Sequence, residues 1–171
     1  MWKIAIFAAA AAAATPQTPV ARDSTPRWHV EDQHSQLDDA QTFTANLDST
    51  NMLRDSVGSL EAATLFVQCE AGELNVYVAW PPYMGSEKFK VRWKFDAGPV
   101  TGQTWTGSEL GTATFTPKPY EFLAGLTGAR RFVIDVPVLQ QDDVEAVFDT
   151  TGADKIVAAA LAACPKPQHT E

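Results

Sequence analysis

Between Lys88 and Asp96, apolar and charged side chains alternate without interruption. The apolar positions are Phe89, Val91, Trp93 and Phe95, and the charged positions are Lys88, Lys90, Arg92, Lys94 and Asp96. Because successive side chains of a strand point to opposite faces, this pattern predicts an antiparallel strand with one face on a core and the other in water. The chain must therefore supply further strands that share this core.

The clearest hairpin precedes this strand. Its first strand ends at Cys69, residues 70–73 turn the chain, and Pro81-Pro82 ends the second strand. Apolar side chains recur at every second position and share one inward face, namely Leu65, Val67, Cys69, Leu74, Val76, Val78 and Trp80. Gly, Pro and Asp clusters separate further expected strands at 41–48, 102–106, 112–116, 131–136 and 143–149.

Two helices are expected among these strands. A short one begins at Pro119 and ends before Gly128. A second carries apolar residues at helical spacing from Ala153 to Cys164, with Thr151 and Asp154 expected to cap its start and Pro165 to stop it. We therefore expect a mainly β fold, an antiparallel β-sandwich or half-barrel of about seven strands with one short helix and a C-terminal helix packed on the sheet.

The N-terminus resembles a secretory signal peptide. After Lys3, the segment from Ile4 to Ala14 is uncharged and ends in alanines, which predicts a signal peptide over residues 1–14, or to Ala21 as a second choice. Its helix would be about 17 Å long, whereas a membrane span needs about 30 Å, so we expect no stable membrane span. We expect a flexible leader over 15–27, a single β-rich domain over 28–165, a polar tail over 166–171, and a periplasmic or secreted protein.

The two cysteines, Cys69 and Cys164, both lie on apolar faces of their predicted elements. In an oxidising compartment, buried thiols that approach each other are normally joined. The sequence has no C-x-x-C motif and no histidine within a few residues of either cysteine, which disfavours redox catalysis or metal binding. We therefore predict a disulfide that ties the last helix to the sheet.

The formal net charge of −8 disfavours nucleic acid and anionic lipid as partners. Within this acidic chain, Lys88, Lys90, Arg92 and Lys94 share one face of a single strand. One interpretation is that neighbouring strands place carboxylates beside them. The other is a docking surface for an acidic partner or a glycan, in which case reversing the charge at Lys90 and Arg92 should weaken binding and leave stability unchanged.

The sequence offers little that would support catalysis. His29, Asp32 and His34 lack the helical spacing of a metal site and are expected in a solvated loop. The acid pairs Asp38-Asp39 and Asp142-Asp143 are expected in turns and loops, since adjacent residues of a strand face opposite ways. With no nucleophile or phosphate-binding motif, we expect a protein that is not an enzyme and needs no cofactor.

The order of several short motifs resembles the periplasmic accessory family associated with type VI secretion, the TagO/VasI group. The resemblance covers about residues 60–165 and rests on a strand ending in Cys69, residues 91–96 (Val-Arg-Trp-Lys-Phe-Asp), Trp105, residues 113–115 (Ala-Thr-Phe), and residues 148–152 leading to a helix that ends at Cys164. The chain departs from that family in having Pro165-Lys166-Pro167 where the family usually has a Gly-Trp pair. The resemblance implies a non-catalytic accessory protein with a protein partner in the cell envelope. The alternative is an inhibitor of a cell-wall hydrolase, or a periplasmic hydrolase without a recognisable motif; the oligomeric state is left open.

Overall fold

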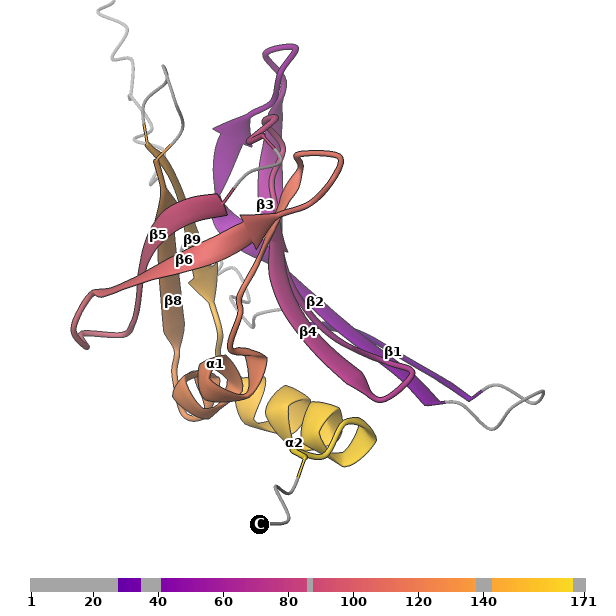
Figure 1. Cartoon of the computed structure of the whole chain (residues 1–171). Coiled ribbons are helices and arrows are strands. Elements are labelled where there is room, and N and C mark those ends of the chain that lie inside the picture. Colours follow the sequence, from indigo (N-terminus) through magenta and orange to yellow (C-terminus); the bar gives the residue numbers. More distant parts are fainter. Residues whose placement is uncertain (1–27, 35–40, 86–87, 138–142, 168–171) are drawn as a thin grey trace, which may run out of the picture.

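The computed structural model describes residues 28–34, 41–85, 88–137 and 143–167. The signal peptide and leader predicted from the sequence lie outside these residues. The described strands form one antiparallel sheet of nine strands in the order β1-β2-β3-β4-β7-β6-β5-β8-β9. This sheet is strongly curved, and both helices lie at one end of it (Figure 1). The expected mainly β fold, with a half-barrel sheet and a C-terminal helix, is confirmed.

Most expected strands are present with small shifts in their ends. The strands are β1 (His29–His34), β2 (Gln41–Arg54), β3 (Leu60–Glu70), β4 (Glu73–Ala79), β5 (Lys88–Phe95), β6 (Thr101–Gly107), β7 (Ala113–Phe115), β8 (Arg131–Val136) and β9 (Val144–Asp149). The helices are α1 (Pro119–Leu126) and α2 (Ala153–Ala163). In the β3–β4 hairpin, Ala71 and Gly72 both have positive φ angles, of 50° and 78°, as a two-residue turn that follows the sheet twist requires.

The expectation of a solvated loop around His29 was wrong, because residues 29–34 form strand β1. This strand pairs with residues 41–46 of β2 in antiparallel register. Ladder hydrogen bonds use only the backbone, so a polar segment can form an edge strand that lies in water on both faces. Among the nine described strands, β1 is the one that no expected strand covers.

A bulge in β2 brings the two ends of the sheet together. The pairing of β2 with β3 shifts between Asp48 and Met52. In this interval the Asn51 side chain donates to the Glu145 carbonyl at 2.8 Å and accepts from the Val147 backbone N–H at 2.9 Å. The Thr50 hydroxyl also donates to the Val147 carbonyl. Side chains of β2 thus hold β9, and they close the half-barrel where the backbone ladder is open.

Aromatic rings fill the interior beneath α1. Phe122 of this helix contacts the rings of Trp93, Phe95, Trp105 and Phe132, with ring centroids 5.0 to 6.0 Å apart. Gly125 allows the helix to approach closely, because a Cβ at this position would lie only 2.7 Å from the Phe95 ring. Edge-to-face aromatic contacts of this kind stabilise a core beyond the area that they bury.

Helix α2 packs on β2 and β3, and the second cysteine directly follows it. The predicted disulfide is confirmed: Cys69 and Cys164 are bonded, with Cα atoms 5.8 Å apart. The expected capping by Thr151 and Asp154 was wrong, since the residue before the helix is Gly152 with a φ of 85° and no side chain caps it. Instead, the Thr151 hydroxyl donates to Asp149, and Asp154 accepts from the Gly128 backbone N–H. Leu161, one of the apolar residues at helical spacing from Ala153 to Cys164, is 37% exposed.

Candidate functional site

The outer face of the sheet, opposite the core, carries the cations singled out in the sequence. Lys88, Lys90 and Arg92 are exposed on β5, and Lys94 is half-buried at its end. The apolar residues between them point inward, with Phe89 and Val91 buried. The strand therefore separates charged and apolar side chains as expected.

Arg92 differs from the lysines because it has carboxylate partners. Its guanidinium contacts Asp135 of β8 and lies 3.3 Å from Asp143, just before β9. The Arg92 side chain is 60% exposed and that of Asp135 is 18% exposed. The interpretation that neighbouring strands supply carboxylates thus describes Arg92, whereas the described residues show no ion pair for Lys88 or Lys90.

A shallow hollow of about 590 Å³ lies beside this strand. Its lining comes from β5, β6 and the ends of the β8–β9 connection: Lys90, Val91, Arg92, Gly102, Gln103, Thr104, Pro137 and Asp143. Its charged side chains are the pair of Arg92 and Asp143 just described, together with Lys90. One guanidinium engages both Asp135 and Asp143, so these three side chains form an ion-pair network.

A row of aromatic rings crosses the same outer face. Phe66 on β3, Tyr77 on β4 and Phe115 on β7 are register partners. Their rings stack, with centroids 4.8 Å apart for Phe66 and Tyr77 and 4.6 Å apart for Tyr77 and Phe115. We call these three residues the aromatic row. Continuing across the sheet in the same register, Phe115 pairs with Thr106, which pairs with Lys88.

The sequence reasoning missed the aromatic row, although a signal was present. In residues 65–67 and 76–78 every side chain is apolar or aromatic, so alternation identifies the inward positions but leaves Phe66 and Tyr77 on the outward face. Aromatic side chains at outward positions of two paired strands predict a cross-strand pair.

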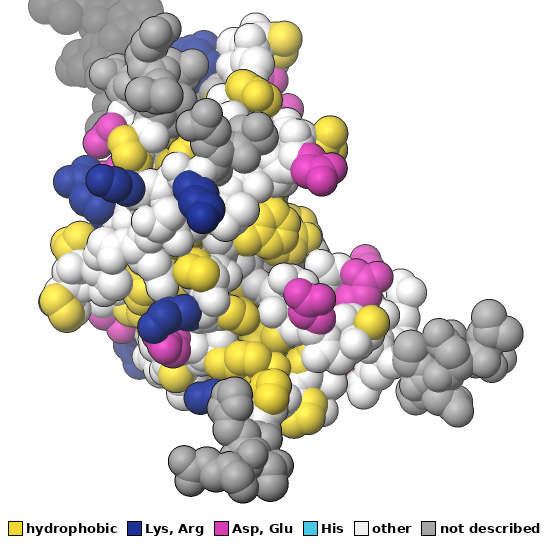
Figure 2. All heavy atoms as spheres, in the orientation of Figure 1, with side chains coloured by type: hydrophobic (Ala, Val, Ile, Leu, Met, Phe, Trp, Pro, Cys, Tyr) yellow, Lys and Arg dark blue, Asp and Glu magenta, His cyan; other side chains and the backbone are white. Residues whose placement is uncertain are grey.

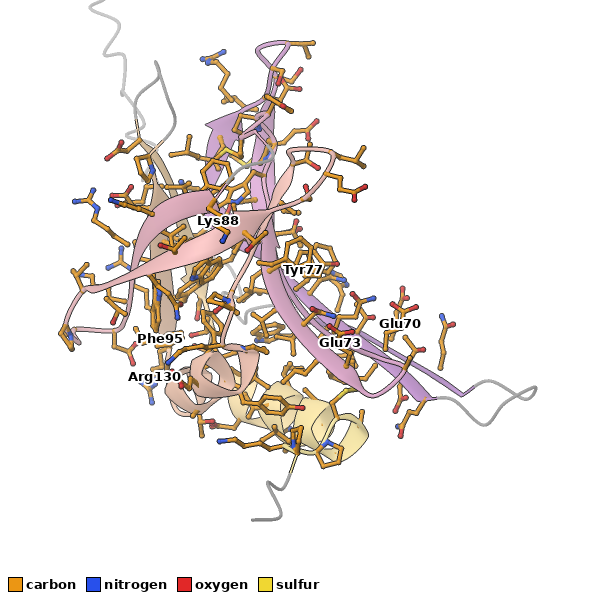
Figure 3. All side chains as sticks on the ribbon, viewed as in Figure 1. Glu70, Glu73, Tyr77, Lys88, Phe95 and Arg130 are labelled. Carbon is orange, nitrogen blue, oxygen red and sulfur yellow. A yellow bond between two sulfur atoms is a disulfide. The ribbon has the colours of Figure 1, made fainter. Side chains whose placement is uncertain are left out.

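Among the titratable side chains that the structure describes, Tyr77 is the one whose pKa is clearly changed by its surroundings. Burial between the neighbouring rings raises the pKa of its hydroxyl, and the negative charge of Glu70 raises it further. Glu70 and Glu73 are both exposed at the end of the β3–β4 hairpin. In Figure 3 Tyr77 lies between these two carboxylates on one side and Lys88 on the other.

The described residues contain no group of three or more His, Cys, Asp and Glu side chains that could hold a metal ion. His29 and Asp32 lie on opposite faces of β1, as their separation by three positions on a strand requires. In the same part of the chain, no helix has the length and apolar character needed to cross a membrane.

Comparison with known proteins gives a relationship in fold. The crystal structure of invasion associated protein B from Bartonella henselae superposes with a TM-score of 0.53. The match covers 80% of this chain and 93% of that chain, at 11% sequence identity. At this identity the likeness concerns the fold alone. No family model matches the sequence, and no curated protein does, so the resemblance to the TagO/VasI group stays a prediction.

Proposed function

We propose that this chain is a non-catalytic binding protein of the bacterial cell envelope, which acts by contact with a protein partner through the outer face of its sheet. The observation that carries the proposal is the position of Lys88 and Lys90. These exposed cations have no ion-pair partner among the described residues, and they lie on the same face as the aromatic row. Aromatic side chains beside charged ones are typical of contact surfaces.

The envelope location is supported by the disulfide, because bonds of this kind persist in oxidising compartments and are rare in the cytosol. The predicted signal peptide points the same way. The link to type VI secretion rests on the motif resemblance alone and is part of the proposal on that basis.

Capture from an envelope extract tests the proposal. The bait is the mature protein, and the variant is Lys88→Glu/Lys90→Glu, which leaves the Arg92 ion pair in place. Lys155→Glu/Lys166→Glu is the matched control, since both lysines are exposed but lie on α2 and beyond it. We expect the first variant to lose captured protein and to show a weaker dependence on salt, while the control captures as the wild type does. Equal capture by all three proteins would contradict a role for this face, and capture of a cell-wall hydrolase in an inactive state would favour the inhibitor alternative.

A further inference from the structure

The outer face carries opposite charges on the two sides of the aromatic row. Beyond β5 it is acidic again, since Asp135 of β8 pairs with Arg92 and Glu145 of β9 is exposed. On β1 to β4 it carries four carboxylates, those of Glu31, Asp48, Glu70 and Glu73, and on β5 it carries Lys88, Lys90 and Arg92. The aromatic row lies between the two groups. Figure 2 shows an apolar region with acidic side chains on one side and most of the basic ones on the other, where further acidic side chains also lie; Figure 3 labels Glu73, Tyr77 and Lys88 in the same orientation.

We infer that this face binds a second copy of the chain, so that the acidic end of each copy lies on the basic end of the other. The inference rests on the proposed function, since it names the first partner of the contact surface proposed above. A surface with an acidic end, an apolar centre and a basic end is complementary to itself when a two-fold axis relates the copies.

The spacing of the side chains permits this two-fold arrangement. Lys88 is three strands from Tyr77 in register, a distance of about 14 Å at the usual strand spacing. Glu73 is four residues from Tyr77 along β4, which is also about 14 Å at the usual rise per residue. One direction runs from Tyr77 to Lys88 across the strands, and the other runs from Tyr77 to Glu73 along β4. A two-fold axis that lies in the plane of the face, passes over Tyr77 and bisects these two directions places Lys88 of one copy over Glu73 of the other. The same operation places the two Tyr77 rings over each other, and the two aromatic rows cross at this point.

The free charges at both ends suit such a contact. Glu70 and Glu73 lack an ion pair among the described residues, as Lys88 and Lys90 do, and all four side chains are exposed. Glu70 has a long hydrogen bond from the Gln68 amide at 3.4 Å. A second copy and an envelope partner would use the same lysines, so binding of one excludes binding of the other.

The test uses the purified mature protein and measures its mass in solution over a range of concentrations by sedimentation. We expect a reversible dimer that weakens with added salt. Lys88→Glu/Lys90→Glu makes both ends of the face acidic, and Glu70→Lys/Glu73→Lys makes both ends basic, so each variant alone should be monomeric, with the dimer dissociation constant raised at least about tenfold. These variants change exposed side chains only, and their melting temperatures check that they fold.

Two combinations distinguish pairing from general charge effects. A mixture of the acidic-ended and basic-ended variants should form a mixed dimer, and the variant with all four substitutions should dimerise with itself again. Lys155→Glu/Lys166→Glu should dimerise as the wild type does. A wild type that stays monomeric at every concentration would overturn the inference. So would a folded variant with all four substitutions that stays monomeric while the wild type dimerises. If the wild type is monomeric but Lys88→Glu/Lys90→Glu still abolishes capture from the extract, the proposed function stands without self-association.

Discussion

On the outer face, the Tyr77 ring lies between two other rings, and the negative charge of Glu70 acts on the pKa of its hydroxyl. Burial and a neighbouring negative charge both oppose ionisation of a phenol. The residue thus combines the two properties of this face, an apolar centre and an acidic end. A change in either property should be visible in how Tyr77 titrates.

We expect the Tyr77 hydroxyl to titrate above the usual tyrosine range. The difference in tyrosinate absorbance between wild type and Tyr77→Phe isolates this group from Tyr83 and Tyr120, and Glu70→Gln should lower its pKa part of the way back. The unfolded chain loses this proton first as pH rises. Tyr77 therefore leaves the free energy of unfolding unchanged below pH about 10 and lowers it above that pH. A Tyr77 titration at or below the usual value would contradict the buried, stacked ring.

At the scale of secondary-structure elements, the position of every described strand except β1 followed from local patterns, but the closure of the sheet did not. Strand β8 has the expected bounds, and the inward residues of β3 and β4 are buried as alternation predicts. The contact between Asn51 and β9 joins residues more than ninety positions apart through one polar side chain, and no periodicity reveals such a contact. Strand β1 escaped detection for a related reason, since an edge strand exposed on both faces has no apolar period.

The Asn51 side chain should contribute measurably to stability, because it replaces two backbone hydrogen bonds at the seam between β2 and β9. We expect Asn51→Ala to lower the free energy of unfolding by about 1–3 kcal/mol, since the Glu145 carbonyl and the Val147 N–H lose their partner. Denaturant unfolding measures the change. Asn46→Ala on the same strand is the control and should cost less than about 0.5 kcal/mol, as expected for a surface position. Equal losses in the two variants would show that the Asn51 hydrogen bonds add nothing to the free energy of unfolding.

At the candidate site, too, the sequence predicted what lies within one strand but not the contacts between strands. The four cations of β5 could be predicted as a group because they share one strand and one period. Which of them are free could not, since the Arg92 partners come from β8 and from the residue before β9. The charge reversal first expected to leave stability unchanged included Arg92, and a reversal there would place three carboxylates together. Lys88 and Lys90 are for that reason the better positions for testing the surface.

At the scale of the whole molecule, the disulfide joins two elements that are 95 residues apart. Cys69 lies near the end of β3, and Cys164 directly follows α2. The bond therefore holds the last helix on the first half of the sheet, where α1 and α2 cover the end of the barrel. Most of the hydrophobic core lies between the two cysteines in the chain.

Removing this bond should destabilise the domain without changing its fold. We expect Cys69→Ala/Cys164→Ala to lower the free energy of unfolding by about 2–4 kcal/mol, because the unfolded chain regains the freedom of a long loop. Chemical unfolding under non-reducing conditions measures the loss, and the wild type with added reductant should match the variant. Stability that does not differ between oxidised and reduced wild type would contradict this role.

The same bond determines how the molecule responds to a pull on its two ends. Strands β4 to β9 and both helices lie inside the closed loop, and of the described strands only β1, β2 and β3 lie outside it. A force applied at the termini passes through the sulfur atoms and bypasses the loop. The chain between the two cysteines, a separation of 95 residues and about 330 Å when extended, therefore cannot be pulled out while the disulfide is intact. Single-molecule stretching should show one short extension as β1 to β3 peel away, and the missing length should appear only after reduction. Most of the core would thus stay folded while the two ends of the chain are pulled.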